Sequence, residues 1–198
     1  MVSWENYDLF GEQFFQTYEQ LSFNKIHRNF LKYLPATGTN CLDIGSGSGR
    51  DAVALAKRGY IVTAVEPSGT LMRLAKRTHN QYKIHWINDS LPSLSKVRRL
   101  DEKYEFILLS AVWMHVSPDD RQQALFSLCS ILSRTGHVAL TIRFGPASKD
   151  RMMYPVEIDE LIKQAEKAGL FLIYNGRRTF DSMSRLDVYW KKLVFIKK

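Results

Sequence analysis

Residues 41–51 read CLDIGSGSGRD, and this stretch constrains the fold more than any other part of the chain. A short apolar run leads into three glycines at alternate positions, Gly45, Gly47 and Gly49, and a helix-forming sequence follows at once. Glycines let the backbone turn tightly and let a ligand approach the main chain without meeting a Cβ. The N–H groups at the start of the following helix then face that ligand. We therefore predict a strand, a ligand-binding loop and a helix.

Two acidic residues accompany this loop. Asp43 lies two residues before the first glycine, and Glu66 directly follows the next apolar run, residues 60–65. An acid at the end of that second strand is placed to accept hydrogen bonds from ribose hydroxyls. The dinucleotide fingerprint G-x-G-x-x-G requires a glycine where this chain has Arg50, so it is not matched. A nucleotide-binding Rossmann domain of another kind stays open as an alternative.

Predicted helices and strands alternate along the whole chain. The alternation is typical of an open α/β sheet, and the continuously apolar run 106–109 suits a central parallel strand covered on both faces. The final two predicted strands lack a helix between them and are expected to pair antiparallel. The predicted strands are 40–44, 60–65, 83–87, 104–110, 136–143, 170–176 and 188–196, and the predicted helices are 10–34, 50–58, 70–78, 118–132 and 157–168.

The pattern D-x-G-x-G-x-G, followed by a distant acid, resembles motif I and the next acidic position of the class I S-adenosylmethionine (SAM) dependent methyltransferases. Recognisable motifs cover roughly residues 40–143. The resemblance implies an α/β fold with a Rossmann-like, seven-stranded mixed sheet and helices on both faces. It implies one methyltransferase domain over 1–198, with an N-terminal helical lid over 1–35 and a Rossmann-like core over 36–198.

The same resemblance implies SAM as cofactor, S-adenosylhomocysteine (SAH) as product, and a role for several strand-end residues. Asp43 is expected at the amino-acid end of the cofactor, Glu66 at the ribose and Asp89 at the adenine amino group. An ordinary helix cap or turn acid is the alternative for Asp89. The full set of predicted cofactor-binding residues is Asp43, Gly45, Gly47, Gly49, Glu66, Pro67, Asp89, Ser90 and Ser110.

The acceptor side of the predicted site follows the fourth strand. His115 is the candidate general base, since a histidine takes up a proton near neutral pH, although it could simply orient its loop. Trp113 either stacks on the acceptor or contacts the sulfonium through a cation–π interaction, or it packs in the core. Arg143, and Arg151 after it, either bind an anionic acceptor or form surface ion pairs. The aromatic residues Phe14, Phe15 and Tyr18 are candidates for a lid that excludes water, or they pack on the domain.

Other features of the sequence limit which types of reaction and which binding partners are expected. The chain lacks the Asn/Asp-Pro-Pro-aromatic and Pro-Cys motifs of DNA-base methyltransferases, and Cys41 and Cys129 are expected to be inert core thiols, so attack on a base through cysteine is not expected. No metal site is predicted. The net charge of +8 is dispersed along the sequence, which favours solvated faces over a nucleic-acid surface. No membrane-spanning run or signal peptide is recognised, so a cytoplasmic location is expected.

These observations predict a SAM-dependent methyltransferase that acts on a small polar or anionic acceptor. Two alternatives stay open: an RNA or protein methyltransferase, suggested by the positive charge, and a non-catalytic SAM-binding sensor or partner module. The sequence specifies neither the acceptor nor the oligomeric state.

Overall fold

The structure is a computed structural model that describes residues 4–147, 151–183 and 185–198. Helices and strands alternate from β1 to β6, after an N-terminal segment made only of short helices, and β7 and β8 then follow β6 with no helix between them in the described residues. The strands are β1 (Asn40–Ile44), β2 (Ile61–Val65), β3 (Ile84–Ile87), β4 (Tyr104–Ser110), β5 (Leu132–Phe144), β6 (Leu170–Asn175), β7 (Thr179–Phe180) and β8 (Tyr189–Lys197). The α-helices are α1 (Glu5–Leu9), α2 (Gly11–Glu19), α3 (Phe23–His27), α4 (Arg50–Ala56), α5 (Gly69–Thr78), α6 (Ser95–Arg98), α7 (Arg121–Ile131) and α8 (Ile158–Lys167), and the 3₁₀ helices are η1 (Arg28–Tyr33), η2 (Trp113–His115) and η3 (Pro118–Asp120).

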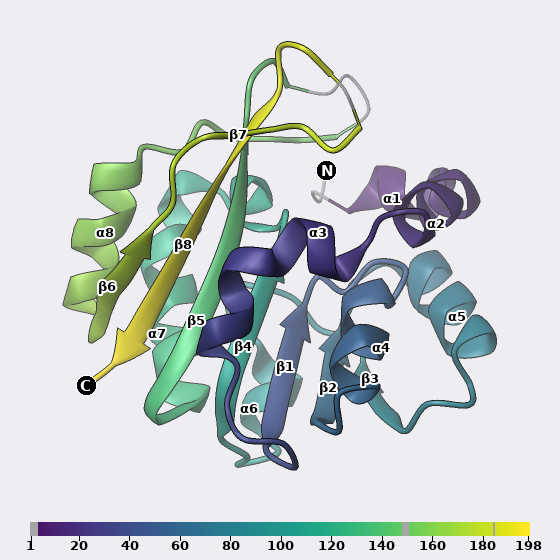
Figure 1. The fold of residues 1–198 in the computed structure, drawn as a ribbon, viewed down its shortest axis with the longest axis horizontal. Helices are drawn as coiled ribbons and strands as arrows, with labels where there is room; N and C mark the ends of the chain where they lie inside the picture. Colours follow the sequence, from purple (N-terminus) through teal and green to yellow (C-terminus); the bar gives the residue numbers. More distant parts are fainter. Residues whose placement is uncertain (1–3, 148–150, 184) are drawn as a thin grey trace.

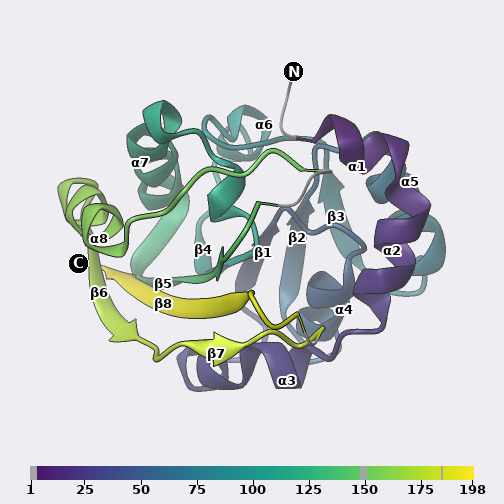
Figure 2. The ribbon, with the colours of Figure 1, turned by 90° about the horizontal axis from the view of Figure 1, so that it is seen from above.

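Seven strands form one sheet in the order β3-β2-β1-β4-β5-β8-β6, and the two-residue β7 pairs with β8 at the sheet's margin (Figure 1). The first five strands of this path are parallel, whereas β8 runs antiparallel to both β5 and β6. Seen from above, α6 and α7 lie on one side of the sheet and α3 and α4 on the other (Figure 2). The predicted Rossmann-like mixed sheet with helices on both faces is therefore confirmed.

Alternate residues of the central strands supply two separate cores. Leu42 of β1 and Ile107 of β4 pair in register and belong to the cluster beneath α7 and α8, whereas Cys41 and Phe106 pair and belong to the cluster beneath α4 and η1. Because both faces of a parallel sheet are covered, the strand sequence is apolar at successive positions rather than at every second one. The loops at the carboxyl ends of the strands are left free for binding.

The predicted helix over 10–34 is wrong as a single element. The segment contains α2, α3 and η1, because the chain leaves the helix after Glu19 and Ser22 starts a new one by accepting a hydrogen bond from the backbone N–H of Lys25. The strand predicted over 136–143 begins earlier, at Leu132, directly after α7. The pairing of β4 with β5 shifts register in this part of the strand, where Thr135 has a φ of 64°. The sequence pattern did not reveal this irregularity.

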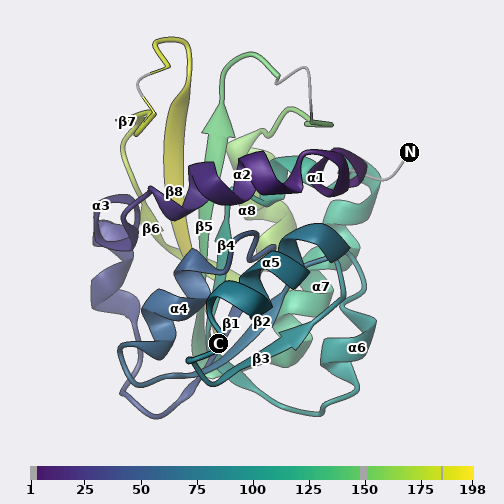
Figure 3. The same ribbon diagram turned by 90° about the vertical axis from the view of Figure 1, so that its right-hand side faces the viewer.

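The N-terminal helices lie across the sheet rather than beneath it. α1 and α2 run above the ends of the strands and pack beside α5 (Figure 3). Asp8 fixes this position, since its carboxylate accepts hydrogen bonds from the Ser68 hydroxyl and the Thr70 backbone N–H at the start of α5. Within the described ranges, no helix has the length and apolar character needed to cross a bilayer.

Candidate active site

A cavity of about 920 Å³ lies where β1, β2, β4 and β5 end. Loops that follow these strands form its floor, and α1, α2 and α3 contribute to its roof. Ligands of open α/β sheets bind at this edge, beyond the carboxyl ends of the strands. Eight of the nine predicted cofactor residues line the cavity, and these eight are Asp43, Gly45, Gly47, Glu66, Pro67, Asp89, Ser90 and Ser110.

The three glycines of the loop serve different purposes. All have positive φ, at 65° for Gly45, 54° for Gly47 and 84° for Gly49, so the loop conformation itself favours glycine. A Cβ on Gly49 would lie 2.5 Å from the Trp86 ring, and Gly49 does not line the cavity. Its predicted contact with the cofactor is therefore replaced by a packing role. A Cβ on Gly47 would lie 3.5 Å from the Tyr18 ring, which shows that α2 covers the loop.

Beneath this loop lie buried polar atoms that line the cavity and have few partners among the described residues. Both carboxylate oxygens of Asp43 and the hydroxyl of Ser46 make no hydrogen bond of ordinary geometry with a described residue. Burial raises the pKa of Asp43 well above its usual range, and the negative charge of Asp51 adds to that effect. The positive charge of Arg50 and the backbone N–H of Ala52 offset this only in part, so the site favours a ligand that brings a cation or a hydrogen-bond donor. The ammonium group of SAM's amino-acid end supplies both, which means that the residues fit this cofactor.

Glu66 is held at the end of β2 by the glycine loop. Its carboxylate accepts hydrogen bonds from the backbone N–H of Gly47 at 2.7 Å and of Ser68 at 2.8 Å. Burial nevertheless raises its pKa to about 7. The residue lines the cavity, and each of its oxygens has a further lone pair with which to accept a hydroxyl.

Asp89 lies at the cavity edge but is heavily engaged by its own loop. Its carboxylate accepts hydrogen bonds from the backbone N–H groups of Ser90, Lys96 and Val97. These contacts match the cap alternative considered from the sequence. They hold the loop after β3 in place and leave Ser90 beside it on the cavity wall.

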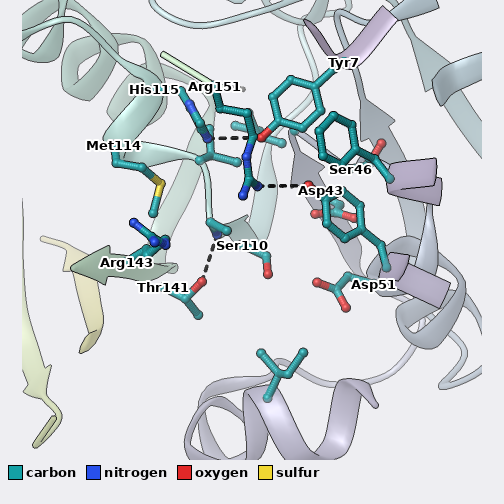
Figure 4. Close-up of a pocket in the computed structure, with 18 of the residues that line it drawn as sticks. Tyr7, Asp43, Ser46, Asp51, Ser110, Met114, His115, Thr141, Arg143 and Arg151 are labelled. Carbon is teal, nitrogen blue, oxygen red and sulfur yellow. Dashed lines mark hydrogen bonds between the residues drawn. The ribbon is translucent and has the colours of Figure 1, made fainter. Parts of the chain in front are cut away.

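His115 enters the cavity from the 3₁₀ turn after β4. Its Nδ1 lies 2.6 Å from the carbonyl oxygen of Met152, and its Nε2 lies 3.3 Å from the hydroxyl of Tyr7 (Figure 4). Burial lowers the pKa of His115 to about 4, and the nearby charges of Arg151 and Arg143 lower it further against the opposing effect of the Met152 carbonyl. The imidazole is therefore neutral at physiological pH and able to accept a proton.

Arg143 and Arg151 face the same cavity as His115 (Figure 4). The Arg143 guanidinium donates to the carbonyl of Pro146, and that of Arg151 donates to the hydroxyl of Tyr18. Neither forms an ion pair with a carboxylate of the described residues, and the Nε atom of each is buried without a partner. Burial lowers the pKa of Arg143, as do the charges of Arg185 and Arg151. Among the residues that the structure describes, the surface ion pairs considered from the sequence are therefore not formed.

Trp113 does not take the predicted catalytic position. Its side chain is fully buried in the core cluster that contains Leu109 and Leu140, and it does not line the cavity. Because the chain turns as a 3₁₀ helix over 113–115, Trp113 packs against the sheet while His115 faces the cavity. Of the three aromatic lid candidates, Phe14 and Tyr18 line the cavity and stack on each other, whereas Phe15 packs towards His79 outside it.

Several residues of the site were not found from the sequence. Tyr7 reaches His115 from α1 across 108 positions of the chain. His27, fully buried in α3, contacts the carboxylate of Asp51 at 2.9 Å, and Arg50 binds the same carboxylate through two nitrogens. Ser110 approaches His27 at 3.4 Å, so this network joins α3 to the glycine loop and to the end of β4. Apart from the adjacent residues Arg50 and Asp51, these pairs are distant in sequence and form no recognisable motif.

Comparisons with known proteins agree with this geometry. A sequence profile described as a methyltransferase domain matches residues 41–136. A ubiquinone biosynthesis O-methyltransferase from Coxiella burnetii is 31% identical over 110 residues, which are 54% of this chain and 45% of that protein. The chain thus spans about half the length of the curated relatives it matches.

Two solved structures share the fold over nearly the whole chain. A TehB-like SAM-dependent methyltransferase from Corynebacterium glutamicum superposes with a TM-score of 0.69 at 22% identity, covering 95% of this chain and 98% of that one. Magnesium protoporphyrin IX methyltransferase from Synechocystis, with bound SAM, gives 0.68 at 16% identity, covering 98% and 89%. Residues 41–136 therefore form a methyltransferase domain, and the strand order and overall fold of the chain are those of SAM-dependent methyltransferases.

Proposed function

We propose that this chain is an enzyme that transfers a methyl group from SAM to a small anionic acceptor, within a single domain whose residues 1–35 form a lid over the core at 36–198. The observation that carries the proposal is the position of a neutral His115 beside Arg143 and Arg151 in the cavity whose floor includes the glycine loop, with neither arginine in an ion pair to a carboxylate of the described residues. Half-buried cations of this kind favour a ligand that brings negative charge.

The cofactor is held by the strand-end residues in this proposal. Asp43 and Ser46 receive the ammonium group, Glu66 with Pro67 receives the ribose, and the loop of Asp89 and Ser90 borders the adenine. SAM supplies an electrophilic methyl group on a sulfonium, so the protein needs mainly to align the acceptor and to exclude water.

Residues on the acceptor side of the cavity bind the acceptor and take up its proton. Arg143 and Arg151 bind the negative charge of the acceptor and orient its reactive atom. His115 ends with the proton that the acceptor loses, because its imidazole is neutral and its unprotonated nitrogen, Nε2, faces the Tyr7 hydroxyl in the cavity. The O-methyltransferase name of the Coxiella burnetii relative supports oxygen as the reactive atom.

The test begins with calorimetric titration of SAM, SAH and NAD. We expect SAM and SAH to bind and NAD not to bind. A screen of metabolites for SAM-dependent mass gain, with each carboxylic acid compared with its methyl ester, then identifies the acceptor class, and acids are expected to react while their esters do not. NAD binding without SAM binding, or robust methylation of RNA with none of metabolites, contradicts the proposal. Strong SAM binding with no turnover on any substrate favours the sensor alternative.

A further inference from the structure

The contact between Tyr7 and His115 has a defined direction. The carbonyl oxygen of Met152 can only accept, so the Nδ1 atom that lies 2.6 Å from it carries the imidazole proton. Nε2 is then the unprotonated nitrogen, and the Tyr7 hydroxyl at 3.3 Å donates to it. Both ring nitrogens of His115 are therefore occupied within the chain, and a substrate finds no free lone pair on the imidazole.

Tyr7 presents the accepting atom that His115 lacks. Its hydroxyl oxygen keeps two lone pairs after donating its proton, and the residue lines the cavity. Arg151 lies beside the hydroxyls of Tyr7 and Tyr18, where its positive charge stabilises electron density that builds up on a phenolic oxygen. In Figure 4 the side chains of Tyr7, His115 and Arg151 converge at one side of the cavity.

We propose that Tyr7 is a catalytic residue that relays the acceptor's proton to His115. The inference rests on the proposed function. As the bond between the methyl carbon and the acceptor atom forms and the carbon–sulfur bond breaks, the acceptor's proton passes to the Tyr7 oxygen and the Tyr7 proton passes to Nε2. Tyr7 ends neutral, His115 ends as a cation and the sulfonium becomes a neutral thioether, so charge is conserved.

This relay does not require a free tyrosinate. Burial raises the pKa of Tyr7 far above its usual range, and the hydroxyl therefore stays protonated at physiological pH. Because Tyr7 accepts one proton while it gives up another, its tyrosinate form is not needed as an intermediate. In the part of the chain that the structure describes, the charged and titratable groups that face His115 are Tyr7 from α1, Arg143 from β5 and Arg151 from the loop after β5, and of these only Tyr7 donates to its Nε2.

Tyr7→Phe tests the relay because it removes one oxygen atom and keeps the ring. The ring packing on Phe14, with centroids 5.0 Å apart, and the edge contact with His115, with centroids 5.8 Å apart, are retained. We expect kcat to fall by about 10² to 10⁴ fold, as for loss of a proton-transferring group, with SAM affinity unchanged. Tyr33→Phe, in η1 and outside the cavity, is the matched control and is expected to retain full activity.

Two further readouts separate a relay from a structural role. In a double-mutant cycle, Tyr7→Phe combined with His115→Ala is expected to cost no more than the worse single change, because both groups serve one proton path. Nuclear magnetic resonance titration of His115 in the cofactor-free protein is expected to show a different pKa in Tyr7→Phe, because the hydrogen bond between the Tyr7 hydroxyl and Nε2 is gone.

Each negative result rules out a different part of the proposal. Full or increased kcat in a folded Tyr7→Phe protein overturns the relay while leaving the proposed function intact. An unchanged pKa of His115 in that variant overturns the hydrogen bond itself. Absence of methyl transfer by the wild-type chain on every acceptor tested overturns the proposed function and the relay together.

Discussion

Glu66→Gln tests two expectations in one variant. The first is that Glu66 binds the ribose of the cofactor, and the second is that burial raises the pKa of its carboxyl group. The substitution keeps the size of the side chain and removes its charge. Each carboxylate oxygen of Glu66 accepts one backbone N–H, from Gly47 and from Ser68. A glutamine satisfies only one of these donors and turns its own N–H₂ group towards the other, so a charge-assisted hydrogen bond is lost.

The size of the pH effect follows from the pKa. A carboxyl group whose pKa rises from 4.5 to about 7 has an ionised form that is about 3 kcal/mol less stable, relative to its protonated form, than in the unfolded chain. Between these two values the folded chain holds more protons than the unfolded one. The stabilising contribution of Glu66 is therefore fully present below pH 4.5 and is lost as the pH rises through 7.

The assay is urea unfolding of both proteins at a series of pH values. Glutamine does not titrate, so the free energy of unfolding of the variant minus that of the wild type is expected to increase by about 3 kcal/mol between pH 4.5 and pH 8. His115 has the opposite dependence because its pKa is lowered, but it titrates in both proteins and cancels in the difference. Glu166→Gln, on an exposed position of α8, is the control.

SAM binding is the second measurement on the same variant. Loss of a charged acceptor is expected to weaken binding by about 1.5–3 kcal/mol, or roughly ten- to a hundredfold. A pH-independent stability difference would refute the burial argument, and unchanged affinity for SAM in the folded variant would show that Glu66 is not the ribose acid.

Three further substitutions test the acceptor side and the packing around the loop. Arg143→Ala is expected to raise the acceptor's KM by roughly ten- to a hundredfold with a smaller change in kcat, as steady-state kinetics will show, and an unchanged KM contradicts the anion-binding role. Trp113→Ala is expected to destabilise the fold by about 3–5 kcal/mol in urea unfolding, and a small effect is incompatible with full burial. Gly49→Ala is expected to cost more stability than Gly38→Ala, since both glycines have φ near 85° but only Gly49 has the Trp86 ring where a Cβ would lie.

The sequence predicted the strand, loop and helix around Gly45 and Gly47 correctly, and most of the proposed cofactor residues line the cavity, because the information is local there. An apolar strand, a glycine-rich turn and a following helix determine one another's geometry within about a dozen residues, and the strand-end acids repeat at regular intervals. Gly49 shows the limit of such reasoning. Its spacing matches the loop pattern, but its surroundings depend on Trp86, which another strand brings to it.

The acceptor side was less predictable because it is assembled from distant segments. Trp113 and His115 are two residues apart, and only the 3₁₀ turn decides that one is buried and the other faces the cavity. Likewise, no periodic pattern relates Tyr7 to His115, and the break at Ser22 that sends α1 and α2 across the cavity interrupts an otherwise helical sequence.

Arg143 and Arg151, which form no ion pair with a described carboxylate, have a thermodynamic consequence for the order of binding in the proposed reaction. SAM carries a sulfonium cation, and in this cavity it shares the electrostatic field of Arg143 and Arg151. An anionic acceptor neutralises that field, so each ligand is expected to bind more tightly when the other is present, by the same factor in both directions. Once the methyl group has moved, the thioether of SAH has no such charge. The coupling then disappears, and product release is expected to be independent of whether a fresh acceptor has arrived.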